Sequence, residues 1–401
     1  MLSYQDMRRV VITGIGALTP LGNSFPESWE ALKMGLSGIG GITRFDAGQS
    51  PWRLAGELKN FDPSLFLTKK EMNRLDPFVH YAVSAAIMAA DDAGIFEKGL
   101  CCDSGVIIGS SRGGITMIEK DLKRKRTSPF LMPATTINMA ASYVAQKLGI
   151  KGYCLGISNA CASGANAIGE AYRLVRSGIL KSVLAGGAEA PVCRVCIEGY
   201  GVSGALSKRV SQTPSPFDKK RDGFVLAEGS CIVLIEDLEM AIKRGARIYG
   251  EIVGYGNSVD AFHMTRPSAE GESMAIKNAL KEAGIRREDI DLIVTHGTGT
   301  EIGDLVEMMA LRAIFGDRLL QAVAIKSMTG HMLAASGAFE AAVTVMCLYE
   351  KVLLPTINIS VLEDGCNLRM FKESKNSEIN IAISNAFGFG GVNSVLVMKG
   401  Y

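Results

Sequence analysis

A cysteine that precedes a predicted helix is the side chain best placed to act as a nucleophile. Cys161 lies in the segment NACASG at residues 159–164, between an apolar segment at 153–158 and an amphipathic helix expected at about 162–177. Small residues on both sides allow a sharp turn and the close approach of a ligand. At the start of a helix, unpaired amides and the helix dipole favour the thiolate over the thiol. A small buried thiol is the alternative, and this segment alone does not decide between the two.

Two of the four histidines have surroundings typical of a site. His80 falls inside a predicted helix, where a packing or surface role is expected. His263 falls in a predicted loop, where structural hydrogen bonding is expected. His296 and His331 each follow an apolar strand-like segment and lie beside glycine. Because loops of this kind build the sites of α/β folds, His296 and His331 are the candidate partners of Cys161.

Strand-like and helix-like segments alternate along the chain. In the first half, strands are predicted at residues 9–13, 104–109, 153–158, 182–186 and 230–236, and helices at 28–34, 70–93 and 162–177. In the second half, strands are predicted at 248–254, 292–295 and 379–384, and helices at 273–282, 304–313 and 337–349. This alternation predicts a layered α/β fold. The similar order of elements suggests an internal duplication, with both halves sharing one sheet stack.

The composition indicates a globular protein with a large core. The chain has 401 residues, of which 47% are hydrophobic and 21% charged. The net charge is only +2, so the protein is not expected to bind nucleic acid. Nine scattered cysteines in so long a chain favour a reducing compartment, so a cytoplasmic location is expected. Cys193 and Cys196 form one CxxC without a second pair, which favours two partly buried thiols over a zinc site.

Several other motifs fail their tests. The GIG at residues 14–16 is interpreted as following a strand, but the last glycine of a dinucleotide-binding GxGxxG is missing. No P-loop and no GxSxG elbow occur. Residues 127–150 carry no charge, but Pro129 and Pro133 interrupt them, so no membrane span is expected there. The apolar run at 10–17 after two arginines lacks a cleavage site and is expected to be a buried strand. No cofactor or metal is predicted.

Three longer motifs carry a resemblance to a known family. They are RVVITGIG at residues 9–16, SPFDKKRDGF at 215–224 and NAFGFGG at 385–391. With these motifs the chain resembles the β-ketoacyl-acyl-carrier-protein synthases, most closely the type II enzymes, nearly from end to end. The resemblance implies a thiolase-like α/β fold with two similar halves in a five-layer αβαβα arrangement. Residues 1–246 would carry the nucleophilic cysteine and residues 247–401 both catalytic histidines.

The resemblance also implies a reaction and a catalytic triad. Cys161 would accept an acyl group and condense it with malonyl-acyl-carrier protein, giving a 3-oxoacyl-carrier protein and carbon dioxide in fatty acid or related polyketide elongation. His296 and His331 would hydrogen-bond the malonyl thioester oxygen and stabilise the enolate that forms on loss of carbon dioxide. Lys326 and Glu340 match a charged pair of the family and are expected to orient His331.

Further residues match the family's binding elements. The amides of Cys161 and Phe389 match an oxyanion hole, and Phe389 also matches a gating phenylalanine on a glycine-rich loop. Thr298 and Thr300 match threonines that contact the phosphopantetheine arm of the carrier.

Basic residues are expected to dock the acidic acyl carrier protein. Lys69, Lys70 and Arg74 open the predicted helix 70–93, a second run covers residues 123–126, and a third covers residues 208–209. The alternative is that each run simply lies on a solvent-exposed face and docks no partner. The residues predicted to dock the carrier are Lys69, Lys70, Arg74, Lys125, Arg126 and Arg209.

Four positions depart from the type II pattern and leave the acyl substrate open. Gly299, Glu301 and Val392 stand where serine, proline and threonine are common. Arg112 stands where type II enzymes carry an apolar residue facing the acyl pocket. An arginine keeps its charge in a pocket, so three arrangements are open. It could pair with an acidic group across a dimer, it could turn toward water, or the acyl group itself could carry polar or conjugated groups.

Two related classes are disfavoured and one alternative stays open. Chain-length-factor subunits share the fold but lack the active cysteine. A thiolase acting on coenzyme A esters would need a second cysteine near residues 387–393, where none occurs. A specialised ketosynthase subunit of a polyketide or polyene pathway, working with a chain-length-factor-like partner, is the alternative. A homodimer is expected, and a heterodimer with a related subunit is possible.

Overall fold

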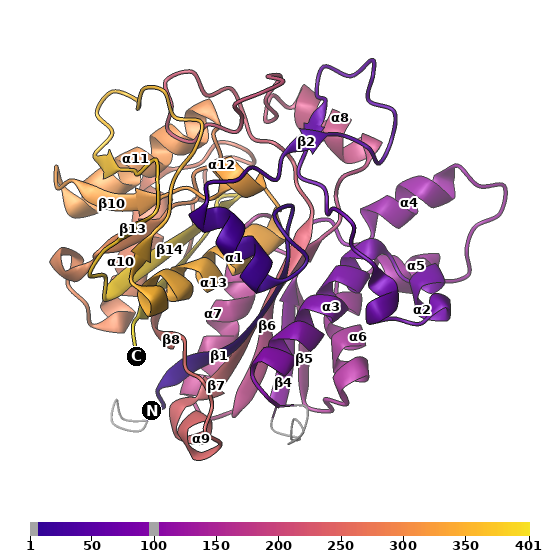
Figure 1. The fold of residues 1–401 in the computed structure, drawn as a ribbon, viewed down its shortest axis with the longest axis horizontal. Helices are drawn as coiled ribbons and strands as arrows, with labels where there is room; N and C mark the ends of the chain where they lie inside the picture. Colours follow the sequence, from indigo (N-terminus) through magenta and orange to yellow (C-terminus); the bar gives the residue numbers. More distant parts are fainter. Residues whose placement is uncertain (1–6, 96–103) are drawn as a thin grey trace.

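One eleven-stranded sheet runs through the molecule in the computed structural model, which describes residues 7–95 and 104–401 (Figure 1). The strand order is β12-β10-β9-β14-β15-β8-β1-β7-β6-β4-β5. The strands are β1 (Val10–Leu18), β4 (Ser104–Gly109), β5 (Tyr153–Ile157), β6 (Ser182–Glu189), β7 (Gly229–Asp237), β8 (Gly250–Val259), β9 (Leu292–Val294), β10 (Leu320–Val323), β12 (Leu368–Arg369), β14 (Ile381–Gly388) and β15 (Val392–Lys399). Two short pairs lie outside this sheet: β2 (Gly40–Gly41) with β3 (Leu54–Ala55), and β11 (Val352–Leu353) with β13 (Lys375–Asn376).

The two halves of the sheet join at a short seam between β1 and β8. β1 pairs antiparallel with β7 along almost its whole length. It pairs with β8 only from Val10 opposite Ile252 to Ile12 opposite Gly250. Beyond this seam the halves separate, and helices fill the space between them. The prediction that both halves share one continuous sheet is confirmed.

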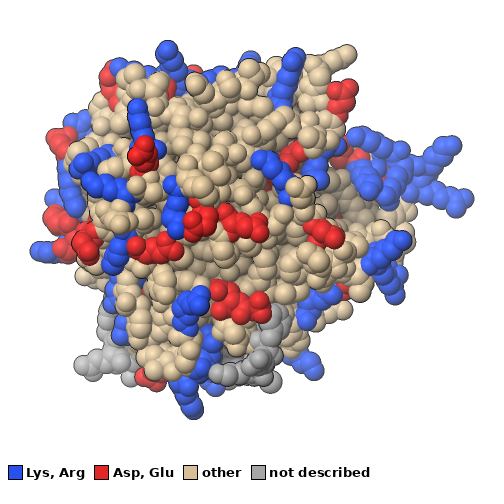
Figure 2. Space-filling model, viewed as in Figure 1, with Lys and Arg blue, Asp and Glu red and all other residues tan. Residues whose placement is uncertain are grey.

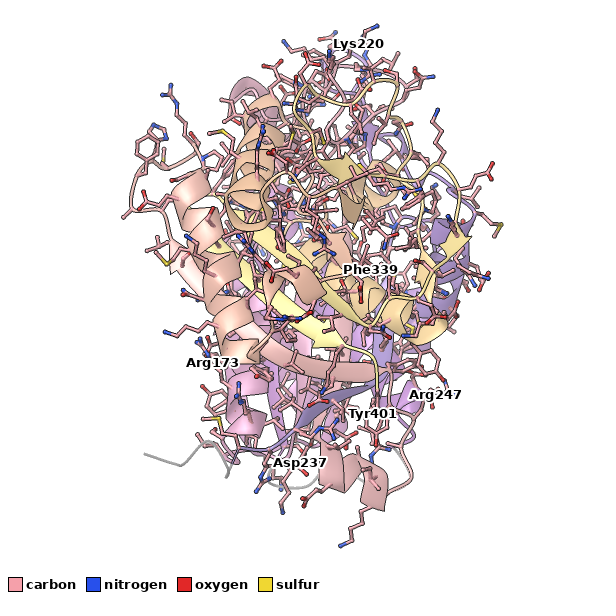
Figure 3. The ribbon with its side chains drawn as sticks, turned by 90° about the vertical axis from the view of Figure 1, so that its left-hand side faces the viewer. Arg173, Lys220, Asp237, Arg247, Phe339 and Tyr401 are labelled. Atoms are coloured by element: carbon pink, nitrogen blue, oxygen red, sulfur yellow. The ribbon has the colours of Figure 1, made fainter. Side chains whose placement is uncertain are left out.

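Helices form three layers around the two sheet halves. On the outer faces lie α3 (Pro77–Asp92) with α6 (Met139–Leu148), and α10 (Ala269–Ala283) with α11 (Glu301–Phe315). Between the halves, α7 (Ser163–Arg176) packs against α13 (Ala334–Glu350). Phe339 of α13 is fully buried and lies in the interior, whereas Lys220 lies at one end of the molecule (Figure 3). The predicted five-layer αβαβα arrangement is therefore confirmed.

The remaining helices are short and lie mostly near the loops that surround the central layers. They are α1 (Phe25–Lys33), α2 (Lys69–Arg74), α4 (Ile115–Leu122), α5 (Leu131–Thr135), α8 (Arg194–Val202), α9 (Leu238–Lys243) and α12 (Lys326–Thr329), with 3-10 turns η2 (Pro63–Leu65) and η3 (Arg287–Asp289). Over the described ranges, the structure contains no helix with the length and apolar character needed to cross a membrane. The division of the chain at residues 246 and 247 falls between α9 and β8 and stays a prediction.

Two of the predicted elements are wrong in their extent. The single helix expected at residues 70–93 is two helices, α2 and α3, which are separated at Leu75 and Asp76. Asp76 has extended backbone and caps α3 by accepting from the amide of Phe78, and Pro77 favours a helix start at that point. The GIG at residues 14–16 does not follow a strand but lies inside β1.

The glycines of β1 are explained by the close approach of α3. A Cβ atom on Gly16 would lie 2.0 Å from the carbonyl oxygen of Ala85, and one on Gly14 would lie 2.2 Å from that of Ala89. Neither position has room for a side chain, so β1 and α3 pack with their backbones almost in contact.

We predict that Gly16→Ala destabilises the protein by about 3 kcal/mol, because the new methyl group must push α3 away from β1. Gly40→Ala is the matched control, since a Cβ there meets nothing within 4 Å, and it should change stability by less than about 0.5 kcal/mol. Thermal unfolding at one protein concentration compares the two variants with the parent. Equal melting temperatures for the two variants would contradict the packing account.

Candidate active site

A cavity of about 450 Å³ brings the predicted nucleophile and both predicted histidines together. Cys161, His296, His331 and Phe389 line it, although they are far apart in the sequence. The four residues come from loops that follow strands or precede helices in both halves of the chain. Cys161 and His331 are buried and His296 is largely buried, so groups entering this cavity leave bulk water.

A strained turn holds Cys161 just ahead of α7. Ala160 has a φ of +47°, in the left-handed region that an alanine seldom adopts. Ser163 stabilises the turn, because its hydroxyl donates to the carbonyl of Ala160 (2.6 Å) and accepts from the amide of Asn159 (2.8 Å). The helix begins at Ser163, so Cys161 lies two residues before it, close to the predicted position. Strain at a turn that bears a nucleophile is typical of a functional site.

The imidazole of His331 contacts the nucleophile directly. Its Nε2 lies 3.0 Å from the Sγ of Cys161, and its Nδ1 lies 3.2 Å from the hydroxyl oxygen of Ser336. That hydroxyl already accepts from the amide of Met332 (2.8 Å). The Ser336 hydroxyl can therefore donate to Nδ1, which leaves the ring proton on Nε2, facing the cavity.

Lys326 orients His296 and not His331. The Lys326 ammonium lies 3.3 Å from Nδ1 of His296, donates to the His296 carbonyl at 2.5 Å and forms a buried ion pair with Glu340. The expectation that Lys326 and Glu340 orient His331 is therefore wrong, because Ser336 occupies that role. An ammonium group can only donate, so Nδ1 of His296 must accept and its proton must lie on Nε2.

Burial and the Lys326 charge keep both imidazoles neutral. Burial lowers the pKa of His296 well below its ordinary value, and the positive charge of Lys326 lowers it further. Burial, then Lys326, also lowers the pKa of His331. The rings lie 5.5 Å apart, nearly at right angles. The cavity thus holds two neutral imidazoles that can each donate one hydrogen bond.

Burial also changes the state expected for Cys161. It raises the pKa of the thiol to about 11, against the lowering effects of Lys326, Arg112 and the amide of Phe389. The expectation of a favoured thiolate is therefore wrong, because the effect of desolvation on the thiol pKa outweighs that of the helix start. Burial also raises the pKa of Glu340 to about 7, whereas the charge of its ion-pair partner Lys326 lowers it.

A glycine-rich turn brings the amide of Phe389 to the sulfur of Cys161. The Phe389 amide hydrogen-bonds the sulfur, and a Cβ on Gly388 would lie 3.2 Å from the amide nitrogen of Cys161. Gly390 and Gly391 have φ values of +85° and +69°, which favour glycine. The amide of Phe389 therefore lies beside the reactive atom, and an oxyanion hole formed by the amides of Cys161 and Phe389 stays a prediction.

Thr298 and Thr300 line the same cavity, nearer the start of α11. Their hydroxyl oxygens lie 3.0 Å apart, and Thr300 caps α11 by accepting from the amide of Gly303. Gly299 between them has a φ of +81°, so glycine suits this position and the departure from the common serine is tolerated. Both hydroxyls can contact a polar arm that enters the cavity.

Sequence reasoning missed three residues that shape the cavity. Ser336 follows His331 by five residues without any motif, so only the fold reveals their contact. Glu307 accepts from the amides of His296 and Gly297, both at 2.8 Å, and thereby fixes the turn that carries His296. Tyr200 lines the cavity beside Phe389, with ring centroids 6.3 Å apart.

The other singled-out side chains have structural roles. His80 is buried in α3. The Nδ1 of His263 accepts from the amides of Thr265 (3.1 Å) and Arg266 (3.2 Å), which confirms the expected loop hydrogen bonding. Cys193 and Cys196 are buried free thiols. No cluster of potential metal ligands occurs within residues 7–95 and 104–401.

The structure brings two of the three basic runs together. The guanidinium of Arg74 in α2 lies 4.3 Å from the ring centroid of Phe130, beside the loop that holds residues 123–126. Lysine and arginine side chains gather on this side of the molecule, over α2 and the loop between α4 and α5 (Figure 2). Arg209 lies apart and donates to Ser215 (3.0 Å), near Asp222, a lining residue of the cavity.

Comparison with known proteins gives matches along nearly the whole chain. Residues 7–241 match the family model described as Beta-ketoacyl synthase, N-terminal domain, and residues 249–360 match Beta-ketoacyl synthase, C-terminal domain. The chain is 42% identical to 3-oxoacyl-[acyl-carrier-protein] synthase 2 of Synechocystis sp., with 99% of each chain covered. It is 41% identical to the protein of the same name from Coxiella burnetii, with 98% of this chain and 99% of the relative covered.

Solved structures agree with these matches. The ishigamide ketosynthase/chain length factor has a TM-score of 0.93 at 33% identity, over 98% of this chain and all of that chain. A type II polyketide ketosynthase bound to the hexaketide and in complex with its acyl-carrier protein has a TM-score of 0.90 at 30% identity, over the same shares.

We predict that His296 and His331 are still neutral at the pH near ~6.5 where a free histidine titrates, because burial and Lys326 lower the pKa of both rings. Lys326→Met removes the neighbouring cation, so the pKa of His296 should rise while burial still holds it below the ordinary value. Isotope-edited NMR of the imidazole nitrogens measures both effects. Titration of either ring near ~6.5 in the parent would contradict this electrostatic account.

Proposed function

The chain belongs to the β-ketoacyl synthase family, and from this premise we propose that it is a condensing acyltransferase. It joins an acyl group held on Cys161 to a malonyl unit carried by acyl carrier protein, releasing carbon dioxide and a 3-oxoacyl-carrier protein. One observation carries the proposal: a buried thiol and two neutral imidazoles meet in one cavity. The relatives named 3-oxoacyl-carrier-protein synthase support the choice of substrate.

In the first step Cys161 accepts the acyl group. Its sulfur bonds to the carbonyl carbon of the donor thioester, the bond to the carrier arm breaks, and the thiol proton passes to the departing arm. The carbonyl oxygen becomes negative in the transition state, where the amides of Cys161 and Phe389 can donate to it. Because burial favours the thiol over the thiolate, attack on the donor carbonyl requires loss of the thiol proton, which the departing arm takes up.

In the second step the malonyl unit loses carbon dioxide. The electron pair of the broken carbon–carbon bond becomes an enolate, and its oxygen can accept one hydrogen bond from Nε2 of each histidine. The enolate carbon then bonds to the acyl carbon, the bond to the sulfur of Cys161 breaks, and the released thiolate takes up a proton from the solvent. Each neutral imidazole carries its one ring proton on Nε2, so each can donate one hydrogen bond to the enolate oxygen.

Lys326 and Glu340 act in this scheme as positioning residues. The ammonium fixes Nδ1 of His296 as an acceptor and thereby aims Nε2–H at the cavity. Glu340 offsets part of the cost of burying that ammonium. Thr298 and Thr300 contact the phosphopantetheine arm, and Phe389, whose ring lies beside Tyr200, gates the path to the sulfur.

Carrier docking is proposed for the basic surface formed by Lys69, Lys70, Arg74, Lys125 and Arg126, with Arg209 nearer the cavity. The contact of Arg74 with Phe130 supports one continuous patch for the first five. An acidic partner would be attracted to such a patch.

Assembly and location belong to the same proposal. The protein acts as a homodimer in the cytoplasm, where the free cysteines of the described residues stay reduced. A heterodimer with a chain-length-factor-like subunit is the second candidate, favoured by the similarity to the ishigamide ketosynthase/chain length factor. Light scattering of the purified chain separates them, because a stable dimer without a partner supports the first and a monomer the second.

We predict that Cys161 is the only cysteine to acquire an acyl group. Intact mass after incubation with an acyl donor should show one adduct, and Cys161→Ala should show none, because Cys161 lies beside His331 and the amide of Phe389 in the cavity. Cys154→Ala, which removes an exposed free thiol, should keep the adduct. An adduct on the Cys161→Ala protein would disprove the assignment.

We predict that His296→Ala and His331→Ala each lower malonyl decarboxylation about 10²-fold or more, because each removes one donor to the enolate oxygen. Both variants should keep part of the acylation of Cys161. His263→Ala, which changes a loop histidine, is the control. Parent-like decarboxylation in both site variants would show that the imidazoles do not share this role.

We predict that changing Lys125 and Arg126 together to glutamate raises KM for carrier-bound substrates about tenfold, with little change in kcat, because the positive field that attracts the carrier is weakened. Lys375→Glu, an exposed charge reversal in β13, is the matched control. Added salt should reduce the difference. If both proteins gave the same KM at low salt, the patch would not dock the carrier.

A further inference from the structure

Glu272 is a buried carboxyl group that lines the reaction cavity without a hydrogen-bond partner. It lies in the first turn of α10 and is only 1% exposed. Within residues 7–95 and 104–401, its Oε2 has no hydrogen-bond partner. Buried polar atoms are nearly always hydrogen-bonded, so an unpartnered one beside a cavity points to a ligand. Arg112, by contrast, is exposed, and the described residues that line the cavity do not include it.

Three neighbouring carboxyl groups differ from Glu272, because donors hold each of them as an acceptor. Asp260 and Asp304 each accept from two nitrogen donors at 2.7 to 3.0 Å. Glu307 accepts from two backbone amides at 2.8 Å. Such donors stabilise the charged form of a carboxyl group. Glu272 is the member of the group that lacks them.

The surroundings of Glu272 favour its protonated form. Burial raises its pKa well above the ordinary value, and the negative charges of Glu307, Asp260 and Asp304 raise it further. These charges face Glu272 from α11 and from the loop that follows β8. A protonated carboxyl group donates one hydrogen bond. Glu272 therefore offers the cavity a donor and not a negative charge.

The position of Glu272 lies along the route to the nucleophile. The neighbouring helices α10 and α11 (Figure 1) both border the cavity where they begin, α10 with Glu272 and α11 with its cap Thr300. Exposed charged side chains, Arg266 and Glu301, line the same cavity at its outer end, and Cys161 lies at its buried end. A carrier arm that reaches Cys161 past Thr300 also passes Glu272. The amide groups of that arm have carbonyl oxygens that accept hydrogen bonds.

We propose that Glu272 binds the carrier arm, because its carboxyl group donates a hydrogen bond to an amide carbonyl oxygen of the phosphopantetheine. The inference rests on the proposed condensing function and adds a binding residue from α10 to Thr298 and Thr300.

The test compares two acetyl thioesters that need no carrier docking. Acetyl-pantetheine has the amides of the arm, whereas the acetyl thioester of propanethiol has none. The rate of Cys161 acylation at increasing thioester concentration is followed by intact mass. Glu272→Met, which keeps the length of the side chain and removes both oxygens, should raise the half-saturating concentration of acetyl-pantetheine about tenfold with little change in the maximum rate. Glu272→Gln should stay close to the parent, because its amide nitrogen still donates. The propanethiol ester should not distinguish the three proteins.

Glu270→Met is the matched control, because it makes the same change at an exposed glutamate of the same helix turn. It should keep the parent's half-saturating concentration for both thioesters. Thermal unfolding gives a second readout. Glu272→Met should be at least as stable as the parent, because it removes a buried polar group that has no partner.

Three results would overturn the inference while the function stands. They are a parent-like response of Glu272→Met to acetyl-pantetheine, an equal loss in Glu272→Gln, and an equal loss with the propanethiol ester. A lower melting temperature of Glu272→Met would likewise assign Glu272 to the fold and not to the arm. Failure of both thioesters to acylate Cys161 of the parent would overturn the function itself.

Discussion

The contact between the Lys326 ammonium and Nδ1 of His296 is the interaction on which the chemistry of the cavity depends. It sets the tautomer of His296, since the ammonium has no lone pair and the ring nitrogen must accept. Its charge also lowers the pKa of both histidines, in addition to the larger effect of burial. Two neutral donors can then face one oxygen atom. The buried carboxylate of Glu340 makes the arrangement tolerable, because an unpaired ammonium at this depth would be strongly destabilising.

The layered fold is what brings these groups together. The central helix α13 carries both Ser336, which orients His331, and Glu340, which pairs with Lys326. Its neighbour α7 begins just after Cys161. Because α7 belongs to the first half of the chain and α13 to the second, their packing between the sheet halves places the sulfur beside the histidines. The strained φ of Ala160 persists because this packing fixes the turn from all sides.

Much of the fold and the members of the site could be predicted from the sequence, but several contacts could not. Alternating strands and helices and three long motifs gave the layers, and glycine-flanked His296 and His331 stood out from His80 and His263. The break before α3 was hidden, because Asp76 and Pro77 interrupt a pattern that otherwise continues as one helix. The predicted contact of Lys326 with His331 was wrong. Lys326 is close to His331 in the sequence, but the pairing of β9 with β10 places it beside His296. The protonation state of Cys161 depends on how deeply the thiol is buried, and a local sequence motif does not reveal burial.

Reconstitution of the complete reaction tests the central claim most directly. The purified protein would be given acetyl-carrier protein and malonyl-carrier protein labelled in its free carboxyl group, and the products would be identified by mass. The account predicts one labelled carbon dioxide for each acetoacetyl-carrier protein formed, and no condensation product with Cys161→Ala. Acetyl transfer through Cys161 without a new carbon–carbon bond, or carbon dioxide released without condensation while acetyl donor is present, would contradict it.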